Sequence, residues 1–91
     1  MIKLRLFKTN QFKRSYKKLR FTDDEELSYI EVVYHLLCML PLENKYRDHQ
    51  LKGSMKAFRE CHLKPDLLLV YMVEDNVLKL VDVGTHAELF D

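Results

Sequence analysis

Apolar and polar residues alternate over residues 2–7, IKLRLF, and this period of two predicts a β-strand with one solvent-facing side. Thr9 or Asn10 can cap a helix that follows the strand. The next apolar residues recur at helical spacing: Phe12, Tyr16 and Leu19. The polar side of this predicted helix then carries a stripe of basic residues: Lys13, Arg14, Lys17, Lys18 and Arg20.

A capping box predicts the start of a second helix, because Thr22 is followed three residues later by Glu25 within an acidic first turn. Pro41 marks the end of this helix. Its predicted core stripe consists of Leu27, Ile30, Tyr34, Leu37 and Cys38. Residues 9–40 are therefore expected to form a helical hairpin.

Residues 42–53 are predicted to be a surface loop with little regular structure, and the loop carries His49. Apolar runs of strand length return afterwards at residues 55–62, 66–74 and 77–83. Turns at Leu63-Lys64-Pro65 and at Asp75-Asn76 join these runs into two hairpins. Because residues 67–73 are apolar on both alternating faces, they are expected to form the central strand.

The predicted fold class is α+β. An N-terminal strand, a helical hairpin and a three-stranded antiparallel meander would form a four-stranded sheet with the helices on one face. Gly84 ends the last strand, and Thr85 with Glu88 repeats the capping-box spacing, which predicts a short C-terminal helical turn. A chain of 91 residues suits one domain, which we assign to residues 1–91.

The composition, with 47% hydrophobic and 32% charged residues, is typical of a folded soluble protein. The longest apolar run, residues 67–73, is much shorter than the roughly 20 residues of a membrane-spanning helix. The N-terminus has no signal-peptide pattern, so we expect a cytoplasmic protein. Cys38 and Cys61 show neither CxxC spacing nor a disulfide framework and are predicted to be small buried residues.

Charge is distributed unevenly along the chain, although the net charge is only +1. The first twenty residues contain eight basic residues and no acidic residue, and an acidic segment follows directly. This separation predicts a basic face and an acidic face, and the basic face suits a polyanionic partner.

Ionisable residues gather at one predicted end of the sheet. His62 ends one strand and Asp66 begins the next, so the two are expected within hydrogen-bond reach. Glu60 lies on the same strand face as His62 because side chains alternate along a strand. The legs of the following hairpin have similar lengths and return the chain to the same end, where His86 and then Phe90 follow. His49 is less constrained because its loop is irregular.

The spacing of these residues also fits a structural hydrogen-bonded pair or an exposed polar edge. A metal site is disfavoured because no close-paired motif such as HxxxH or CxxC is present. Cleavage of RNA by its own 2′-hydroxyl requires a base, an acid and cations, and histidine can perform either proton transfer. Basic residues for phosphate and aromatic residues for stacking on an unpaired base are available: Lys52, Lys56, Arg59, Lys64, Tyr46 and Phe90.

Three motifs carry a resemblance to a known family: YRDHQLKG (46–53), FRECHLKPDLLLVY (58–71) and GTHAELF (84–90). Together with the order of predicted elements, they resemble the YafQ-like branch of the RelE/ParE toxin superfamily over the full length of the chain. The resemblance implies a RelE-like fold and a toxin of a type II toxin-antitoxin system. It also implies an mRNA interferase that cuts translated messages in the ribosomal A site, uses no metal or other cofactor, and is neutralised by a cognate antitoxin.

The resemblance further implies the residues of the site. The catalytic set comprises His49, Glu60, His62, Asp66, His86 and Phe90, with Glu60 at a position where the family has aspartate. His86 is assigned as the acid, and His62 or His49, oriented by Asp66, as the base. RNA and ribosome binding are assigned to nine basic residues: Lys13, Arg14, Lys17, Lys18, Arg47, Lys52, Lys56, Arg59 and Lys64.

Two other functions remain open at this point. One is a non-catalytic toxin of the same fold, like the gyrase-poisoning ParE branch, which does not need a cluster of His and Asp residues. The other is a nucleic-acid-binding module that acts through the basic helix. For the antitoxin, we expect an acidic, partly helical segment that lies on the basic face.

Overall fold

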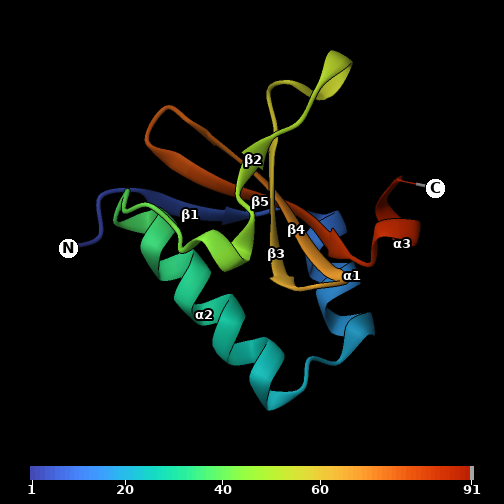
Figure 1. Ribbon diagram of the computed structural model, residues 1–91. Coiled ribbons are helices and arrows are strands. Elements are labelled where there is room, and N and C mark those ends of the chain that lie inside the picture. Colours follow the sequence, from blue (N-terminus) through green and yellow to red (C-terminus); the bar gives the residue numbers. More distant parts are fainter. Residues whose placement is uncertain (91) are drawn as a thin grey trace.

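The computed structural model describes residues 1–90, and its centre is a five-stranded sheet with the strand order β1-β5-β4-β3-β2 (Figure 1). The strands are β1 (Arg5–Lys8), β2 (His49–Gln50), β3 (Arg59–Lys64), β4 (Leu67–Glu74) and β5 (Val77–Gly84). β1 pairs with β5 in parallel, and the other neighbours are antiparallel. The sheet is therefore mixed, with β4 at its centre as predicted.

Three α-helices accompany the sheet: α1 (Asn10–Leu19), α2 (Asp23–Leu37) and α3 (His86–Phe90). The Thr9 side chain accepts a hydrogen bond from the N–H of Phe12 and begins α1. Thr22 and Glu25 form the predicted capping box of α2. In α3, the Glu88 side chain and the Thr85 side chain each accept a bond from the other residue's backbone N–H, at 2.8 and 3.2 Å. Across residues 1–90, no helix is long and apolar enough to cross a membrane.

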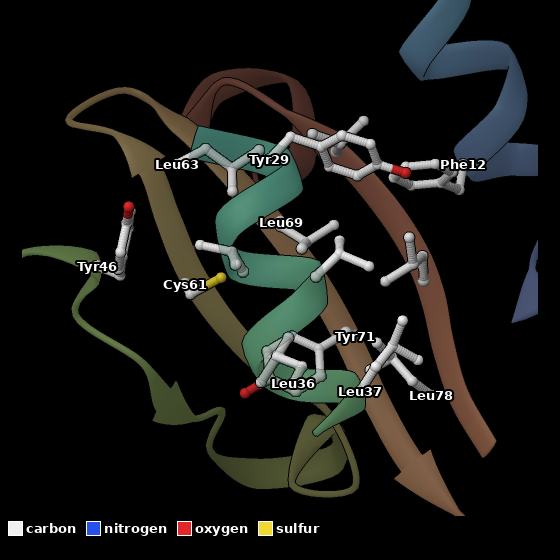
Figure 2. Close-up of a cluster of buried hydrophobic side chains, with 14 of the residues drawn as sticks. Phe12, Tyr29, Leu36, Leu37, Tyr46, Cys61, Leu63, Leu69, Tyr71 and Leu78 are labelled. Carbon is white, nitrogen blue, oxygen red and sulfur yellow. The ribbon is translucent and has the colours of Figure 1, made fainter. Parts of the chain in front are cut away.

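The hydrophobic core lies between one face of the sheet and the helices α1 and α2 (Figure 2). Leu69 and Tyr71 of β4 are 0% and 1% exposed and point toward α2. Phe12 of α1 stacks on Tyr29 of α2 with 6.1 Å between ring centroids, so both helices share this core. Because side chains alternate along a strand, the residues between these core positions lie on the opposite face of the sheet.

The predicted core stripe of α2 is wrong in part. Leu37 and Cys38 are buried, but Leu27, Ile30 and Tyr34 are 64%, 54% and 49% exposed. The helix instead buries Tyr29, Val32, Val33, Leu36 and Leu37. Apolar residues occupy two neighbouring sides of this helix, so the helical period alone fits both stripes. The buried stripe is the one that packs against Phe12 and the sheet.

The prediction for residues 42–53 also needs correction, and with it the predicted count of four strands. This segment contains the 3₁₀ turn η1 (Asn44–Tyr46), the strand β2, and the start of a second 3₁₀ turn, η2 (Gly53–Met55). β2 pairs with β3 through His49↔Glu60 and Gln50↔Arg59. A strand of two exposed residues has no apolar alternation, and its pairing depends on a distant partner, so the local pattern could not indicate it.

The two hairpin turns differ in how well they were predicted. Asp75 and Asn76 have φ angles of 52° and 63°, which is the left-handed geometry expected for a two-residue turn. The first turn lies at Pro65-Asp66 rather than at Leu63-Lys64-Pro65, because β3 continues to Lys64. The register between β3 and β4 shifts between His62 and Lys64, which is the mark of a β-bulge.

Alkaline conditions are expected to destabilise the fold through its tyrosines. Hydrogen bonding to Glu26 and burial raise the pKa of Tyr16 to about 12, and burial together with a hydrogen bond to Asp48 raises the pKa of Tyr71. A pKa raised in the folded state gives stability that is complete below the unfolded value of about 10 and is lost as pH rises through the folded pKa. Urea unfolding at pH 8, 10 and 11 should show a falling midpoint. Tyr71→Phe should lose less stability over this range than the wild type, and an equal loss would contradict the assignment.

Candidate active site

Strand β3 separates the core from the candidate site by simple alternation. Cys61 and Leu63 point into the core, so Glu60 and His62 lie on the opposite face, as predicted. His62 pairs in register with Leu68 of β4, and Leu68 pairs with Gly84 of β5. Leu68 is 1% exposed. A buried apolar residue therefore lies between the strand that carries His62 and the strand that leads to His86.

Glu60 brings two of the four histidines together. Its carboxylate is buried, and its Oε1 atom lies 3.5 Å from Nε2 of His49 and 3.6 Å from Nε2 of His62. The His49 side chain is 50% exposed and the His62 side chain 18% exposed. A buried carboxylate is costly unless it is paired, and the two imidazoles are the groups placed to pair with it.

The other ring nitrogen of each histidine faces a backbone carbonyl. Nδ1 of His49 lies 2.7 Å from the oxygen of Arg47, and Nδ1 of His62 lies 3.1 Å from the oxygen of Pro65. A carbonyl oxygen can only accept a hydrogen bond, so Nδ1 must carry the hydrogen in both rings. In the neutral form, the lone pair of each ring is therefore on Nε2, which is the nitrogen that can act as a base.

The segment that carries His49 is held in place by a partly buried polar network. The Tyr71 hydroxyl donates a hydrogen bond to Asp48, and the guanidinium of Arg59 donates to the same carboxylate at 3.2 and 3.4 Å. Burial acts to lower the pKa of Arg59, but the bonds to Asp48 and Tyr71 outweigh it and raise that pKa. Two nitrogens of Arg59 are thus engaged with Asp48, which limits its availability for the phosphate binding assigned to it.

Asp66 does not orient His62 in the way the sequence predicted. Its Oδ1 accepts a hydrogen bond from the backbone N–H of His86 at 3.2 Å, and within residues 1–90 it forms no hydrogen bond or ion pair with His62. Asp66 lies in the turn between β3 and β4, and its carboxylate faces the start of α3. Asp66 therefore fixes where His86 begins the helix.

His86 and Phe90 form a second group at the same end of the sheet. Their ring centroids are 5.4 Å apart with an interplanar angle of 46°. Neighbouring strands are about 4.8 Å apart, so the Cα atoms of His62 and Gly84, which share a row across three strands, are about 10 Å apart. His86 follows Gly84 by two residues and is exposed. The site thus has the imidazoles of His49 and His62 on one side of Leu68 and that of His86 on the other.

The basic residues assigned to RNA binding are distributed over three regions. Those of α1 are all exposed, as predicted: Lys13, Arg14, Lys17 and Lys18. Lys52 and Lys56 are exposed on the segment between β2 and β3, which projects away from the sheet in Figure 1. Arg47 and Lys64 lie beside His62 around a cavity. Tyr46 is not a free stacking surface, because it is 4% exposed and its hydroxyl donates to Glu31.

A family model described as the bacterial toxin of type II toxin-antitoxin systems, YafQ, matches residues 4–91. The chain belongs to the YafQ toxin family. The match covers the His49–Glu60–His62 group as well as the segment with His86 and Phe90. The toxin identity expected from the three sequence motifs is thereby confirmed.

Individual YafQ relatives agree with this assignment. The mRNA interferase toxin YafQ of Escherichia coli K12 is 39% identical over 71 residues, which cover 78% of this chain and 76% of the relative. A metal-bound toxin from Helicobacter pylori has a crystal structure with 44% identity and a TM-score of 0.85, covering 96% of this chain and 99% of the other. YafQ in the Escherichia coli DinJ-YafQ toxin-antitoxin complex is 34% identical with a TM-score of 0.81, covering 99% and 100%.

Sequence reasoning missed several residues that shape the site of this YafQ family member. Asp48 and Tyr71 anchor the strand that carries His49, and Arg47 and Pro65 contribute carbonyl oxygens to the two imidazoles. Asp48 lies in the motif YRDHQLKG (46–53), so its place beside His49 could have marked it as a residue of the site. A backbone carbonyl leaves no mark in residue identity, so the roles of Arg47 and Pro65 could not be read from the chain.

Proposed function

We propose that this toxin is a metal-independent endoribonuclease that cleaves mRNA in the ribosomal A site by attack of a 2′-hydroxyl. The observation that carries the proposal is the placement of the buried Glu60 between Nε2 of His49 and Nε2 of His62. Such a group can accept a proton and hold the resulting positive charge. The names of the Escherichia coli relatives, mRNA interferase toxins, support the same activity for this chain.

In the proposed mechanism, Nε2 of His62 removes the proton from the 2′-hydroxyl. His62 is preferred over His49 because it is less exposed and shares a row with the strand that leads to His86. The oxygen then attacks the adjacent phosphorus, and Glu60 stabilises the imidazolium that forms. His86 protonates the departing 5′-oxygen, and Asp66 holds His86 in position through its backbone.

Binding of the ribosome and the message is proposed for the exposed basic residues. The lysines and arginine of α1 form one surface, and Lys52 and Lys56 on the projecting segment form another. A cognate antitoxin with an acidic segment is proposed to cover the α1 surface, in line with the toxin-antitoxin complex known for a relative. These interactions would take place in the cytoplasm.

A translating extract provides the test of this function. Purified wild-type protein should produce new 5′ ends within translated messages, whereas His86→Ala should produce them at least about 100-fold more slowly because the leaving oxygen lacks its acid. Messages in which the attacking 2′-hydroxyl is replaced by hydrogen should stay intact. Equal cleavage by the wild type and His86→Ala, or cleavage of the deoxy-substituted message, would refute the proposal.

Removal of transition-metal ions is expected to leave the cleavage rate unchanged. A short RNA that the free enzyme cleaves, or an isolated programmed ribosome in which Mg²⁺ is kept at the minimum for ribosome integrity, would be treated with a chelator selective for transition metals. The cleavage rate should change by less than about twofold, because proton transfer by the imidazoles needs no Lewis acid. A rate that falls with chelation and returns with added zinc or copper would contradict metal independence.

A non-catalytic toxin or a simple nucleic-acid-binding module remains the competing function, supported by the basic surface of α1. Expression of the toxin would then produce a DNA-damage response without loss of mRNA, or binding with a strong salt dependence and no cleavage. Charge reversal of α1 distinguishes a docking surface from a catalytic one. Lost ribosome binding with retained cleavage of free RNA would place these residues in docking alone.

A further inference from the structure

A cavity of about 410 Å³ opens beside His62, at the edge of β3 that β2 leaves uncovered. The end of β3 and η1 with the following Arg47 contribute most of its walls, and Ser28 of α2 adds a hydroxyl. Cavities of this size are typical of small-ligand sites, which range over about 300–1,000 Å³. The cavity lies outside the catalytic steps described above, although His62 borders both.

The charge of the cavity selects for an anion. Lys45, Arg47 and Lys64 line it, and none of its lining residues is acidic. The ion pair of Lys45 with Glu43 is long, 3.8 Å, and both side chains are mostly exposed, so Lys45 remains available. A second cavity of about 330 Å³ near α1 contains Asp82 and Glu88, which would repel an anion. The two cavities therefore differ in the ligand that they accept.

The cavity also has apolar walls that a phosphate ion alone would not use. The exposed Pro65 borders it, together with the largely buried Leu63 and Tyr46. A nucleotide combines a flat apolar base with a charged phosphate, so it can contact the apolar wall and the three cations at the same time. An acidic peptide could pair with the cations, but it has no flat apolar group to place against the apolar side of the cavity.

Two backbone contacts connect the cavity to the imidazoles. Arg47 and Pro65 both line the cavity, and their carbonyl oxygens accept the hydrogen bonds from Nδ1 of His49 and Nδ1 of His62. A ligand that settles against these residues would restrain both carbonyls and so both rings. Occupation of the cavity by the ligand would thereby align the imidazoles of His49 and His62 with the substrate.

From this geometry we infer that the cavity binds one nucleotide of the RNA substrate next to the scissile phosphodiester. The phosphate of that nucleotide contacts Lys45, Arg47 and Lys64, and its base lies against the exposed ring of Pro65. The inference rests on the proposed endoribonuclease function and names a subsite for it. Recognition there contributes to binding and to alignment of His62, and it adds no chemical step.

Binding of nucleoside 5′-monophosphates, followed by amide NMR shifts, tests the inference without any cleavage. The nucleotides should shift the amides of Lys45, Arg47 and Lys64 and bind at least tenfold more tightly than inorganic phosphate or the nucleoside alone. The double variant Lys45→Ala/Lys64→Ala should weaken binding at least tenfold, and its spectrum reports whether it is folded. A matched double variant, Lys3→Ala/Lys8→Ala, removes two exposed lysines at the β1 side of the molecule and should bind like the wild type.

The outcomes separate this inference from the proposed function. His86→Ala lies off the cavity and should keep nucleotide binding even though it is expected to lose cleavage, so an absent cleavage activity would count against the function and not against the subsite. Inorganic phosphate that binds as tightly as the nucleotides would reduce the cavity to a simple anion site and overturn the inference. Unchanged nucleotide affinity in Lys45→Ala/Lys64→Ala would also overturn the inference. This holds even if that variant binds a coexpressed antitoxin more weakly.

Discussion

His62→Ala is expected to cleave programmed ribosomes about 10²- to 10⁴-fold more slowly than the wild type, which is the range over which a general base contributes. The expectation follows from the position of Nε2, which carries the free lone pair because Nδ1 donates to the carbonyl of Pro65. His49→Ala should have a smaller effect, since that ring is half-exposed and lies farther from the row that leads to His86. Single-turnover cleavage measures the chemical step directly.

His35→Ala is the matched control for these histidine variants. His35 lies on α2, where its Nδ1 contacts the carbonyl of Glu31 one turn earlier, and it belongs to neither imidazole group of the site. Its cleavage rate should stay within about threefold of the wild type, as surface substitutions usually have little effect. If His62→Ala were as active as this control, the assignment of the base would be wrong.

Glu60→Gln is expected to lower the cleavage rate by about 10- to 100-fold, which corresponds to the ~1.5–3 kcal/mol of an interaction with a charged group. The substitution keeps the shape of the side chain but removes the charge that stabilises a proton on His62 or His49. Single-turnover cleavage measured beside the wild type checks this expectation.

Glu74→Gln makes the same chemical change at an exposed position at the end of β4. It should leave the cleavage rate as in the wild type. A Glu60→Gln variant as active as Glu74→Gln would contradict the role given to the charge of Glu60. Urea unfolding of both variants shows whether either substitution alters the fold itself.

Periodicity predicted most of the fold because most elements have a strong apolar pattern. The central position of β4 followed from its two apolar faces, and the caps at Thr9, Thr22 and Thr85 followed from short local motifs. The pattern failed in α2, where two sides of the helix are apolar and only packing against Phe12 and the sheet decides between them. It failed again at β2, whose two residues form a strand only because β3 pairs with them.

The candidate site was predicted in its composition and only partly in its contacts. Glu60 and His62 share a face because a strand alternates, and this was visible in the sequence. The predicted partner of Asp66 was wrong: its carboxylate accepts from the backbone N–H of His86, a contact between residues 20 positions apart that no local pattern marks. Whether these residues carry out catalysis stays a prediction for the experiments above.

The carbonyl oxygens of Arg47 and Pro65 have a consequence for the fate of the abstracted hydrogen. Each of them blocks the far nitrogen of its ring, and an acceptor without a hydrogen of its own cannot pass one onward. Neither ring can therefore pass a proton onward through Nδ1. The hydrogen must leave through the same nitrogen that received it, either to the Glu60 carboxylate beside this atom or to water that reaches it once the product has departed.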